Sequence, residues 1–297
     1  MSAPELQIDP DATVLDPGLH FTADMDVASL LLTRERCLLR APLTDAVRAP
    51  GGGASVGMLM TLMDVGSSNP ALVACAGDWT ATQDLSVHRA AGITDGPIVL
   101  DNRLVRVGTK VIIVGVDIYD GRGEDDFDAL HDAVDHGTGL DLAATGLVTF
   151  ARIPRSAARN IEGYDPANWL GEVRHRTLNA TPTGTMYERM GLEVVDADAG
   201  GVQLERTSYV INSIGTINGG ALTVLAEAAA ETLRPGLVAA DMQIHYLSQV
   251  KAGPARTHGA VVRDAHDHSV VSVEIVDHGN EDALLALATV TLQRPAG

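Results

Sequence analysis

Two carboxylates stand out because each lies inside an apolar stretch of the chain. Asp64 interrupts residues 58–65 (MLMTLMDV), and Glu227 ends residues 221–227 (ALTVLAE). An unpaired carboxylate loses several kcal/mol of solvation when it is buried. These two positions therefore indicate either catalysis or a buried hydrogen-bond network.

A glycine pair precedes the second acid. Gly219 and Gly220 lie just before the apolar stretch that contains Glu227, which is typical of a helix start. Free N–H groups at a helix N-terminus attract anions, and glycine lets a carbonyl group approach the backbone closely. The Gly219 N–H is thus suited to stabilise the oxyanion formed when water attacks a carbonyl, an effect of ~3–4 kcal/mol per donor. A carboxylate in apolar surroundings gains proton affinity, which suits a general base.

The elements that must position these residues occur twice. Residues 83–88 (QDLSVH) match 240–245 (ADMQIH) at an interval of 157 positions, whereas 147–152 match 289–294 at an interval of 142. The difference predicts an insertion in the first half, within 121–141. Each half contains a glycine-rich turn, one apolar helix and several strands rich in Val, Ile and Thr. A buried helix wrapped by an antiparallel sheet, occurring twice, predicts an α+β fold.

The second half resembles the hotdog-fold thioesterases, particularly their phenylacetate-pathway (PaaI-like) branch. Their motif is an Asn, then a Gly-x-x-His-Gly-Gly turn that opens the central helix, then an acid on that helix. The segment from Asn212 to Glu227 reads NSIGTINGGALTVLAE and keeps the spacing of the Asn, of Gly219 and of the acid. Asn218 stands where the family has its His.

The resemblance implies sites between the two halves, each joining the turn of one half to the acid of the other. The first such site would consist of Asp64, Thr82, Asn212, Asn218 and Gly219. In it Asp64 would be the general base or nucleophile, and the Gly219 N–H would bind the oxyanion. Asn212 and Thr82 would position the water or the carboxylate.

The second implied site would join Glu227 to the turn at Val56 and Gly57. Here Ala49 replaces the leading Asn of the family, and Ala239 occupies the position of its hydroxyl residue. The sequence therefore predicts one intact site and one degraded site, in which the Val56 N–H remains as a donor.

The resemblance also implies two tandem hotdog domains: 1–155 with the acidic insertion, a connector over 156–179, and 180–297. The activity would be hydrolysis of acyl-CoA to a free acid and coenzyme A, with no cofactor beyond the substrate. The two domains would form an internal pseudo-dimer, and a homodimer of whole chains remains open. Two alternatives are a non-catalytic acyl-CoA-binding protein and an enoyl-thioester hydratase, whose motif residues 64–70 (DVGSSNP) match only in part.

Three basic residues follow strands near the place where relatives bind the nucleotide end of coenzyme A: Arg106, Lys110 and Arg263. Arginine matches the geometry of phosphate, although a surface arginine is usually just solvated. The insertion carries a cluster of acidic and His residues, namely Asp125, Asp126, Asp128, His131, Asp132, Asp135 and His136. Their spacing fits no known metal cage, so we expect a solvated surface and no metal site.

Composition narrows the remaining classes. A formal charge of −18 argues against a nucleic acid or an anionic membrane as a partner. Cys37 and Cys75 are isolated, as in reduced proteins, and no apolar run reaches the ~18 residues that cross a bilayer. With no signal-peptide pattern at the start, a cytoplasmic protein is expected. The 3% of aromatic residues favours an aliphatic over an aromatic acyl group.

Overall fold

A computed structural model of the chain describes residues 20–49, 52–75, 77–159, 161, 163–176 and 184–295. In the first half, a long helix is accompanied by six strands: β1 (Val27–Thr33), β2 (Arg36–Ala41), α1 (Val56–Ala74), β3 (Asp78–Arg89), β4 (Ile98–Val107), β5 (Val111–Asp120) and β6 (Asp141–Pro154). The second half repeats this order: β8 (Glu193–Asp196), β9 (Gly201–Leu204), α4 (Gly219–Leu233), β10 (Val238–Tyr246), β11 (Ala255–Asp264), β12 (His268–Asp277) and β13 (Ala283–Gln293).

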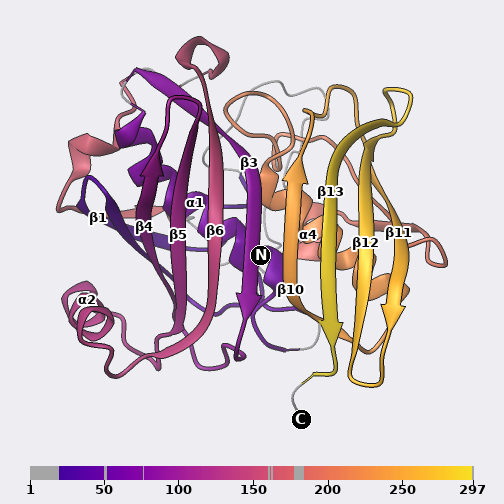
Figure 1. The fold of residues 1–297 in the computed structure, drawn as a ribbon, viewed down its shortest axis with the longest axis horizontal. Helices are drawn as coiled ribbons and strands as arrows, with labels where there is room; N and C mark the ends of the chain where they lie inside the picture. The colour runs from indigo at the N-terminus through magenta and orange to yellow at the C-terminus, as the bar shows by residue number, and fades with distance from the viewer. Residues whose placement is uncertain are drawn as a thin grey trace, which may run out of the picture.

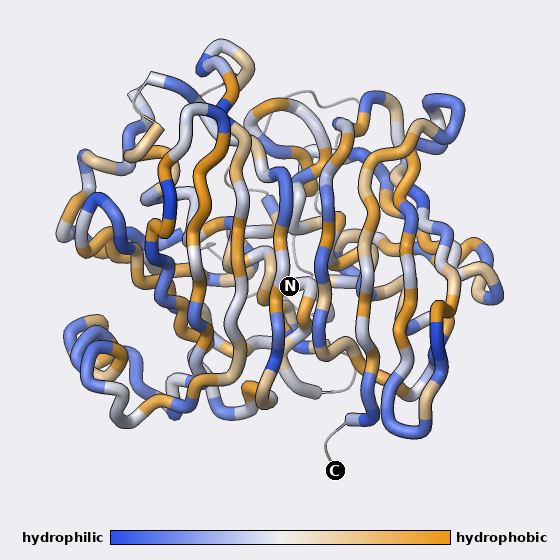
Figure 2. Tube along the Cα trace, viewed as in Figure 1, coloured by the Kyte–Doolittle hydropathy of each residue, from blue (hydrophilic) through white to orange (hydrophobic). Residues whose placement is uncertain are grey.

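One antiparallel sheet runs through both halves. With β7 (Val173–Arg176) at one edge, the strand order is β7-β1-β2-β4-β5-β6-β3-β10-β13-β12-β11-β9-β8. Helices α1 and α4 lie together behind this sheet in the view of Figure 1. Polar and apolar residues alternate along the strands (Figure 2), and every second residue of β5 is buried. The α+β expectation, with a central helix wrapped by antiparallel strands in each half, is confirmed.

The two halves meet at strands β3 and β10. Their antiparallel ladder is centred on the pair Ser86–Gln243, which are the residues that the sequence repeat matches to each other. The pairs Asp84–His245 and His88–Asp241 lie on either side at equal distances along the ladder. A twofold relation between the halves therefore passes through this central pair, and it places each central helix beside the other.

Both central helices begin where the sequence predicts. Ser55 is the N-cap of α1, and its hydroxyl accepts a hydrogen bond from the Met58 N–H at 3.1 Å. Asn218 is the N-cap of α4, and its side chain accepts from the Gly220 N–H at 2.8 Å. Asn218, which replaces the family His, thus has a structural role at the start of the helix.

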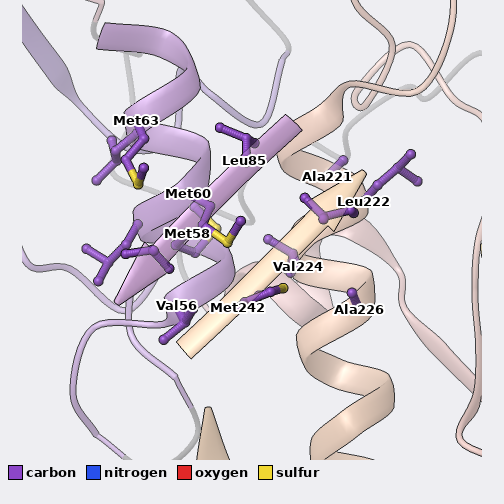
Figure 3. Close-up of a cluster of buried hydrophobic side chains, with 14 of the residues drawn as sticks. Val56, Met58, Met60, Met63, Leu85, Ala221, Leu222, Val224, Ala226 and Met242 are labelled. Carbon is purple, nitrogen blue, oxygen red and sulfur yellow. The ribbon is translucent and has the colours of Figure 1, made fainter. Parts of the chain in front are cut away.

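The two helices approach closely through glycine. A Cβ on Gly57 would lie 2.8 Å from the Val224 Cα, and one on Gly220 would lie 2.5 Å from the Thr61 Oγ1. These contacts are equivalent under the twofold relation. Around them a continuous core joins both helices to β3 and β10, with Leu85 and Met242 among its members (Figure 3). Close backbone approach at these glycines fixes the position of each helix start relative to the other helix.

The insertion contains a helix that packs on the sheet. Helix α2 (Phe127–His136) lies between β5 and β6, where the second half has only the short turn 278–282. Phe127, Leu130 and Val134 pack on the face of the sheet opposite to α1. Asp125 and Asp135 pair with Arg40 and Arg36, and Asp126 caps the helix. The expectation of a merely solvated segment is therefore wrong for one face of α2, because its apolar stripe covers β1, β2 and β4.

The segment between the halves adds a strand to the first sheet edge. After the 3-10 helices Arg155–Ala157 and Pro166–Trp169, strand β7 pairs antiparallel with β1, so that Val27 lies opposite Arg176 and Ser29 opposite Arg174. Within the expected connector, residues 160, 162 and 177–179 lie outside the described residues. Of the helices in the described part of the chain, none combines the length and the apolar character needed to cross a membrane.

Candidate active site

A cavity of about 600 Å³ lies between the two halves. Asp64 and Thr82 line it from the first half, while Asn212, Asn218 and Gly219 line it from the second. The structure thus brings together all five residues that the resemblance grouped into the first site. They come from α1, β3, the start of α4 and the turn before it, so the cavity exists only where the two halves meet.

Asp64 lies in the middle of α1 and is partly buried at the cavity wall. The Thr82 hydroxyl on β3 donates a 2.7 Å hydrogen bond to Asp64 Oδ1. Burial raises the pKa of Asp64 to about 6, and the hydrogen bond from Thr82 opposes that rise. At neutral pH the carboxylate is therefore mostly ionised yet accepts a proton far more readily than a solvated aspartate.

Gly219 is the first residue of α4 and lines the same cavity as Asp64. Among the described residues, no group accepts a hydrogen bond from this N–H, since Asn218 caps the next one. The Tyr246 hydroxyl donates to the Gly219 carbonyl at 2.7 Å, and its ring would lie only 3.2 Å from a Cβ at this position. Tyr246 therefore holds the peptide in place and leaves little space for a side chain. A free N–H at a helix start is a preorganised donor for an oxyanion.

Asn212 lines the cavity from a tight turn. Its side-chain oxygen accepts hydrogen bonds from the Ile214 and Thr216 N–H groups at 3.1 and 3.3 Å. The asparagine thus shapes the loop that leads to α4, in the manner of an Asx turn. Asn212 therefore lines the cavity while its side chain stabilises the turn, and this turn shapes the site.

The equivalent helix start, at Val56 in the first half, is occupied by the carboxylate of Glu227. Glu227 Oε1 accepts from the Val56 N–H at 2.8 Å, and Oε2 accepts from the Gly57 N–H at 3.1 Å and from the Ser55 hydroxyl. Glu227 is 1% exposed. Burial raises its pKa, whereas the hydrogen bonds from Ser55, Gly57 and Val56 lower it. The surviving Val56 N–H is consequently occupied by the carboxylate itself, whereas the cavity described above lies at the other helix start.

The three basic residues proposed for the nucleotide end lie elsewhere. Arg106, Lys110 and Arg263 are exposed, and none of them lines the cavity. The arginines that do line it are Arg174 and Arg176, both on β7. The repeat analysis overlooked them because they belong to neither repeated half. The alternation of arginines in residues 173–176 (VRHR) was the available signal.

Other lining residues also escaped the sequence analysis. His20 lines the cavity, and burial followed by the charge of Arg176 lowers its pKa to about 3, so it is neutral. Aromatic rings gather here despite their scarcity in the chain: Trp79, Phe150, Tyr164 and Tyr246. The overall aromatic content was a poor guide to the cavity, because four of the chain's ten aromatic residues lie in its wall.

Comparisons with known proteins agree with this architecture. Residues 209–293 match the family model of the acyl-CoA thioesterase N-terminal domain. The tesB protein of Mycobacterium avium subspecies paratuberculosis has a TM-score of 0.58 at 10% identity, covering 93% of this chain and 98% of its own. A protein described as an oleoyl thioesterase from Lactobacillus plantarum has a TM-score of 0.57 at 12% identity, covering 93% and 100%.

A hot dog fold protein from Alicyclobacillus acidocaldarius is similar over 89% of this chain and 94% of its own, with a TM-score of 0.54 at 12% identity. At such low identities these structures establish the fold, whereas the matched segment establishes the domain type. The fold is thus that of the hotdog proteins, and residues 209–293 match an acyl-CoA thioesterase domain.

Proposed function

We propose that the protein hydrolyses acyl-CoA thioesters to a free acid and coenzyme A at the single open site between its halves. The observation that carries this proposal is that Asp64 and the unoccupied N–H of Gly219 line one cavity. A base with a pKa of about 6 and a preorganised oxyanion donor are the two groups that thioester hydrolysis requires.

The reaction would begin with the thioester carbonyl oxygen at the Gly219 N–H. Asp64 removes a proton from water as the water oxygen forms a bond to the carbonyl carbon. The negative charge that develops on the carbonyl oxygen is stabilised by the N–H and by the dipole of α4. When the intermediate collapses, the carbon–sulfur bond breaks, the thiolate leaves, and the proton held by Asp64 neutralises it.

The hydroxyl groups around the site support these steps. Thr82 fixes one oxygen of Asp64 by its hydrogen bond, which leaves the other oxygen for water. Tyr246 fixes the Gly219 peptide through its carbonyl. Burial and the charges of Asp64 and Asp84 raise the pKa of Tyr246 well above its usual value, so it remains a protonated donor. Asp64 as a nucleophile is a variant of the same proposal, distinguished by transfer of solvent ¹⁸O into Asp64 during a single turnover.

The acyl group would lie against the apolar and aromatic part of the wall. Leu72, Trp79, Phe150 and Tyr164 line the cavity beside the C-terminal half of α1. These rings accommodate aromatic as well as aliphatic acyl groups, so the composition-based preference for aliphatic acids is not retained.

We also propose that the protein belongs to the phenylacetate-pathway (PaaI-like) branch of the hotdog thioesterases and that it works in the cytoplasm. The thiols of Cys37 and Cys75 are buried and form no disulfide, which supports a reducing, cytoplasmic setting.

The test is release of free thiol from a panel of acyl-CoA thioesters that differ in chain length and aromaticity. Asp64→Asn should lower kcat by about 10²–10⁴-fold, because the amide cannot accept the proton. Wild-type protein that binds acyl-CoA saturably without releasing thiol would instead identify a binding protein. Loss of the double bond of an enoyl thioester without thiol release would identify a hydratase.

The hydratase alternative has little structural support. Residues 64–70, which match part of a hydratase motif, continue α1 as regular helix. The Asn69 side chain donates to the carbonyl groups of Val65 and Gly66 at 3.3 Å each. That asparagine is therefore engaged by its own helix, and the thioesterase interpretation remains the better supported one.

A further inference from the structure

Strand β7 forms a basic wall of the cavity. Arg174 and Arg176 lie opposite Ser29 and Val27 of β1, and all four residues line the cavity. Residues two apart on a strand point to the same face, so this pairing directs both guanidinium groups to the cavity side. The wall is built by the segment between the repeated halves, which has no equivalent in the second half.

The charge of this wall is not neutralised by neighbouring side chains. No carboxylate within the described residues forms an ion pair with Arg174 or Arg176, and Arg176 Nη1 donates a hydrogen bond to the Thr22 hydroxyl at 3.4 Å. Both arginines are exposed, and what sets them apart from other exposed arginines is that they lie two residues apart on the wall of the cavity. Such a pair of positive charges is suited to bind an external anion.

Arg174 is held in place by an aromatic stack. Its guanidinium carbon lies 3.6 Å from the centre of the Trp169 ring. Trp169 contacts Tyr164 at 5.3 Å between ring centres, and Tyr164 contacts Trp79 at 5.9 Å. Trp79 and Tyr164 line the same cavity. Stacking restricts the guanidinium plane while leaving its N–H groups free to bind a planar or tetrahedral anion.

We propose that Arg174 and Arg176 bind the phosphate at the distal end of the substrate's pantetheine arm, with Trp169 as a positioning residue for Arg174. This inference rests on the proposed function and adds the residues that recognise the carrier of the acyl group. The same phosphate occurs in coenzyme A and in the prosthetic group of acyl-carrier proteins. Arginine provides several N–H donors in a fixed fork, which matches phosphate oxygens and gives charge-assisted hydrogen bonds.

The experiment compares one acyl group on four carriers: coenzyme A, 3′-dephospho-coenzyme A, 4′-phosphopantetheine and pantetheine. In R174Q and R176Q, KM should rise about tenfold for the three phosphate-bearing thioesters, with kcat changed less than about twofold. KM for the pantetheine thioester should stay unchanged, because it lacks the phosphate. R34Q, at an exposed arginine of the β1–β2 turn outside the cavity, is the matched control and should resemble wild type.

W169L tests the positioning role. It should raise KM for the phosphate-bearing thioesters by less than R174Q does, and it should add little to R174Q in the double variant. An acyl-carrier-protein thioester tested in parallel shows which carrier the wall serves, since both carry the phosphate. An equal rise in KM for the pantetheine thioester, or no rise for any carrier, would overturn the inference. So would a rise confined to R106Q or R263Q.

Binding of coenzyme A itself, followed by calorimetry, separates this inference from the proposed function. If wild-type protein releases no thiol from any thioester but R174Q and R176Q still bind coenzyme A about tenfold more weakly, the hydrolase proposal fails and the phosphate site stands. If thiol is released and coenzyme A binds all variants equally, the hydrolase proposal stands and the phosphate site is wrong.

Discussion

Asp64 and Glu227 occupy equivalent positions on α1 and α4, yet their carboxylates meet different surroundings. Glu227 reaches the N–H groups of Val56 and Gly57 on the partner helix and bonds to them directly. Asp64 is one methylene shorter, bonds to Thr82 on its own side, and faces a cavity that separates it from Gly219. We attribute the difference between the two helix starts to this one methylene, which the Asp64→Glu variant tests.

The hydrogen bond from Thr82 should set the pH dependence of turnover. A general base acts when deprotonated, so kcat/KM should rise as the pH increases through about 6, the pKa of Asp64. Thr82→Val removes a donor that stabilises the ionised form, so the pKa should rise and the acidic limb should move to higher pH. A pH–rate profile measures this shift. An unmoved limb in Thr82→Val would show that Asp64 is not the titrating base.

Lengthening the side chain at position 64 should block the open site in the way that Glu227 blocks the Val56 position. In Asp64→Glu the extra methylene should let the carboxylate reach the Gly219 N–H, as Glu227 does at Val56. Turnover should then fall sharply, while the added interaction at the start of α4 should raise the free energy of unfolding by about 0.5–2 kcal/mol. Thiol release and urea denaturation measure the two effects. Asp64→Asn is the matched control, expected to lose turnover without the gain; an active Asp64→Glu would contradict the proposed geometry.

At the scale of elements, the hydrogen bonds between Glu227 and the start of α1 connect the two central helices. Ser55, Val56 and Gly57 at the start of α1 all donate to one carboxylate of α4. A carboxylate can accept all of these hydrogen bonds, whereas an amide offers only one oxygen and a donor group instead. Removing these hydrogen bonds should reduce the stability of the interface between the halves more than it reduces turnover at Asp64.

Glu227→Gln should therefore lower the free energy of unfolding by roughly 1–3 kcal/mol, because it leaves a buried donor unsatisfied. Turnover by the folded variant should stay close to that of wild type, since Glu227 does not line the cavity. Denaturation and thiol-release assays below the unfolding transition measure the two properties. A loss of turnover equal to that of Asp64→Asn would indicate two working sites, and a greater loss would place the active site at Glu227.

At the scale of the whole molecule, one chain builds the paired unit and a single open site. The sheet continues from β3 into β10, so the two halves share one core and each supplies residues that the other lacks. The proposed site takes Asp64 from one half and Gly219 from the other, because eight residues of helix separate the acid from the turn of its own half by about 12 Å.

One substrate should consequently bind to each chain. Titration with a non-hydrolysable thioether analogue of an acyl-CoA should give a stoichiometry of one, since Glu227 fills the second position. Isothermal titration calorimetry measures it, and Arg174→Gln should weaken the binding without changing the number of sites. Two equivalent sites per chain would contradict the view that the Glu227 position is closed.

The sequence by itself determined the main elements and grouped five residues that line one cavity. Glycine-rich turns and apolar periodicity located the starts of α1 and α4, because local backbone preferences and hydrophobic burial act over short stretches of chain. The repeat matches Ser86 to Gln243, and the structure pairs these two residues at the centre of the ladder between the halves, since equivalent residues of a twofold arrangement meet at its axis. Asp64 was recognisable because an acid in an apolar helix is costly without a role.

Only the tertiary structure showed how the second helix start is filled and which arginines line the cavity. The occupation of Val56 by Glu227 depends on contacts between residues more than 160 positions apart and on a difference of one methylene, neither of which a motif records. The basic wall arises because β7 adds to the free edge of β1, and any exposed strand edge can pair with many segments. Such pairings are selected by the whole fold, so Arg174 and Arg176 acquire their place only when the chain is folded.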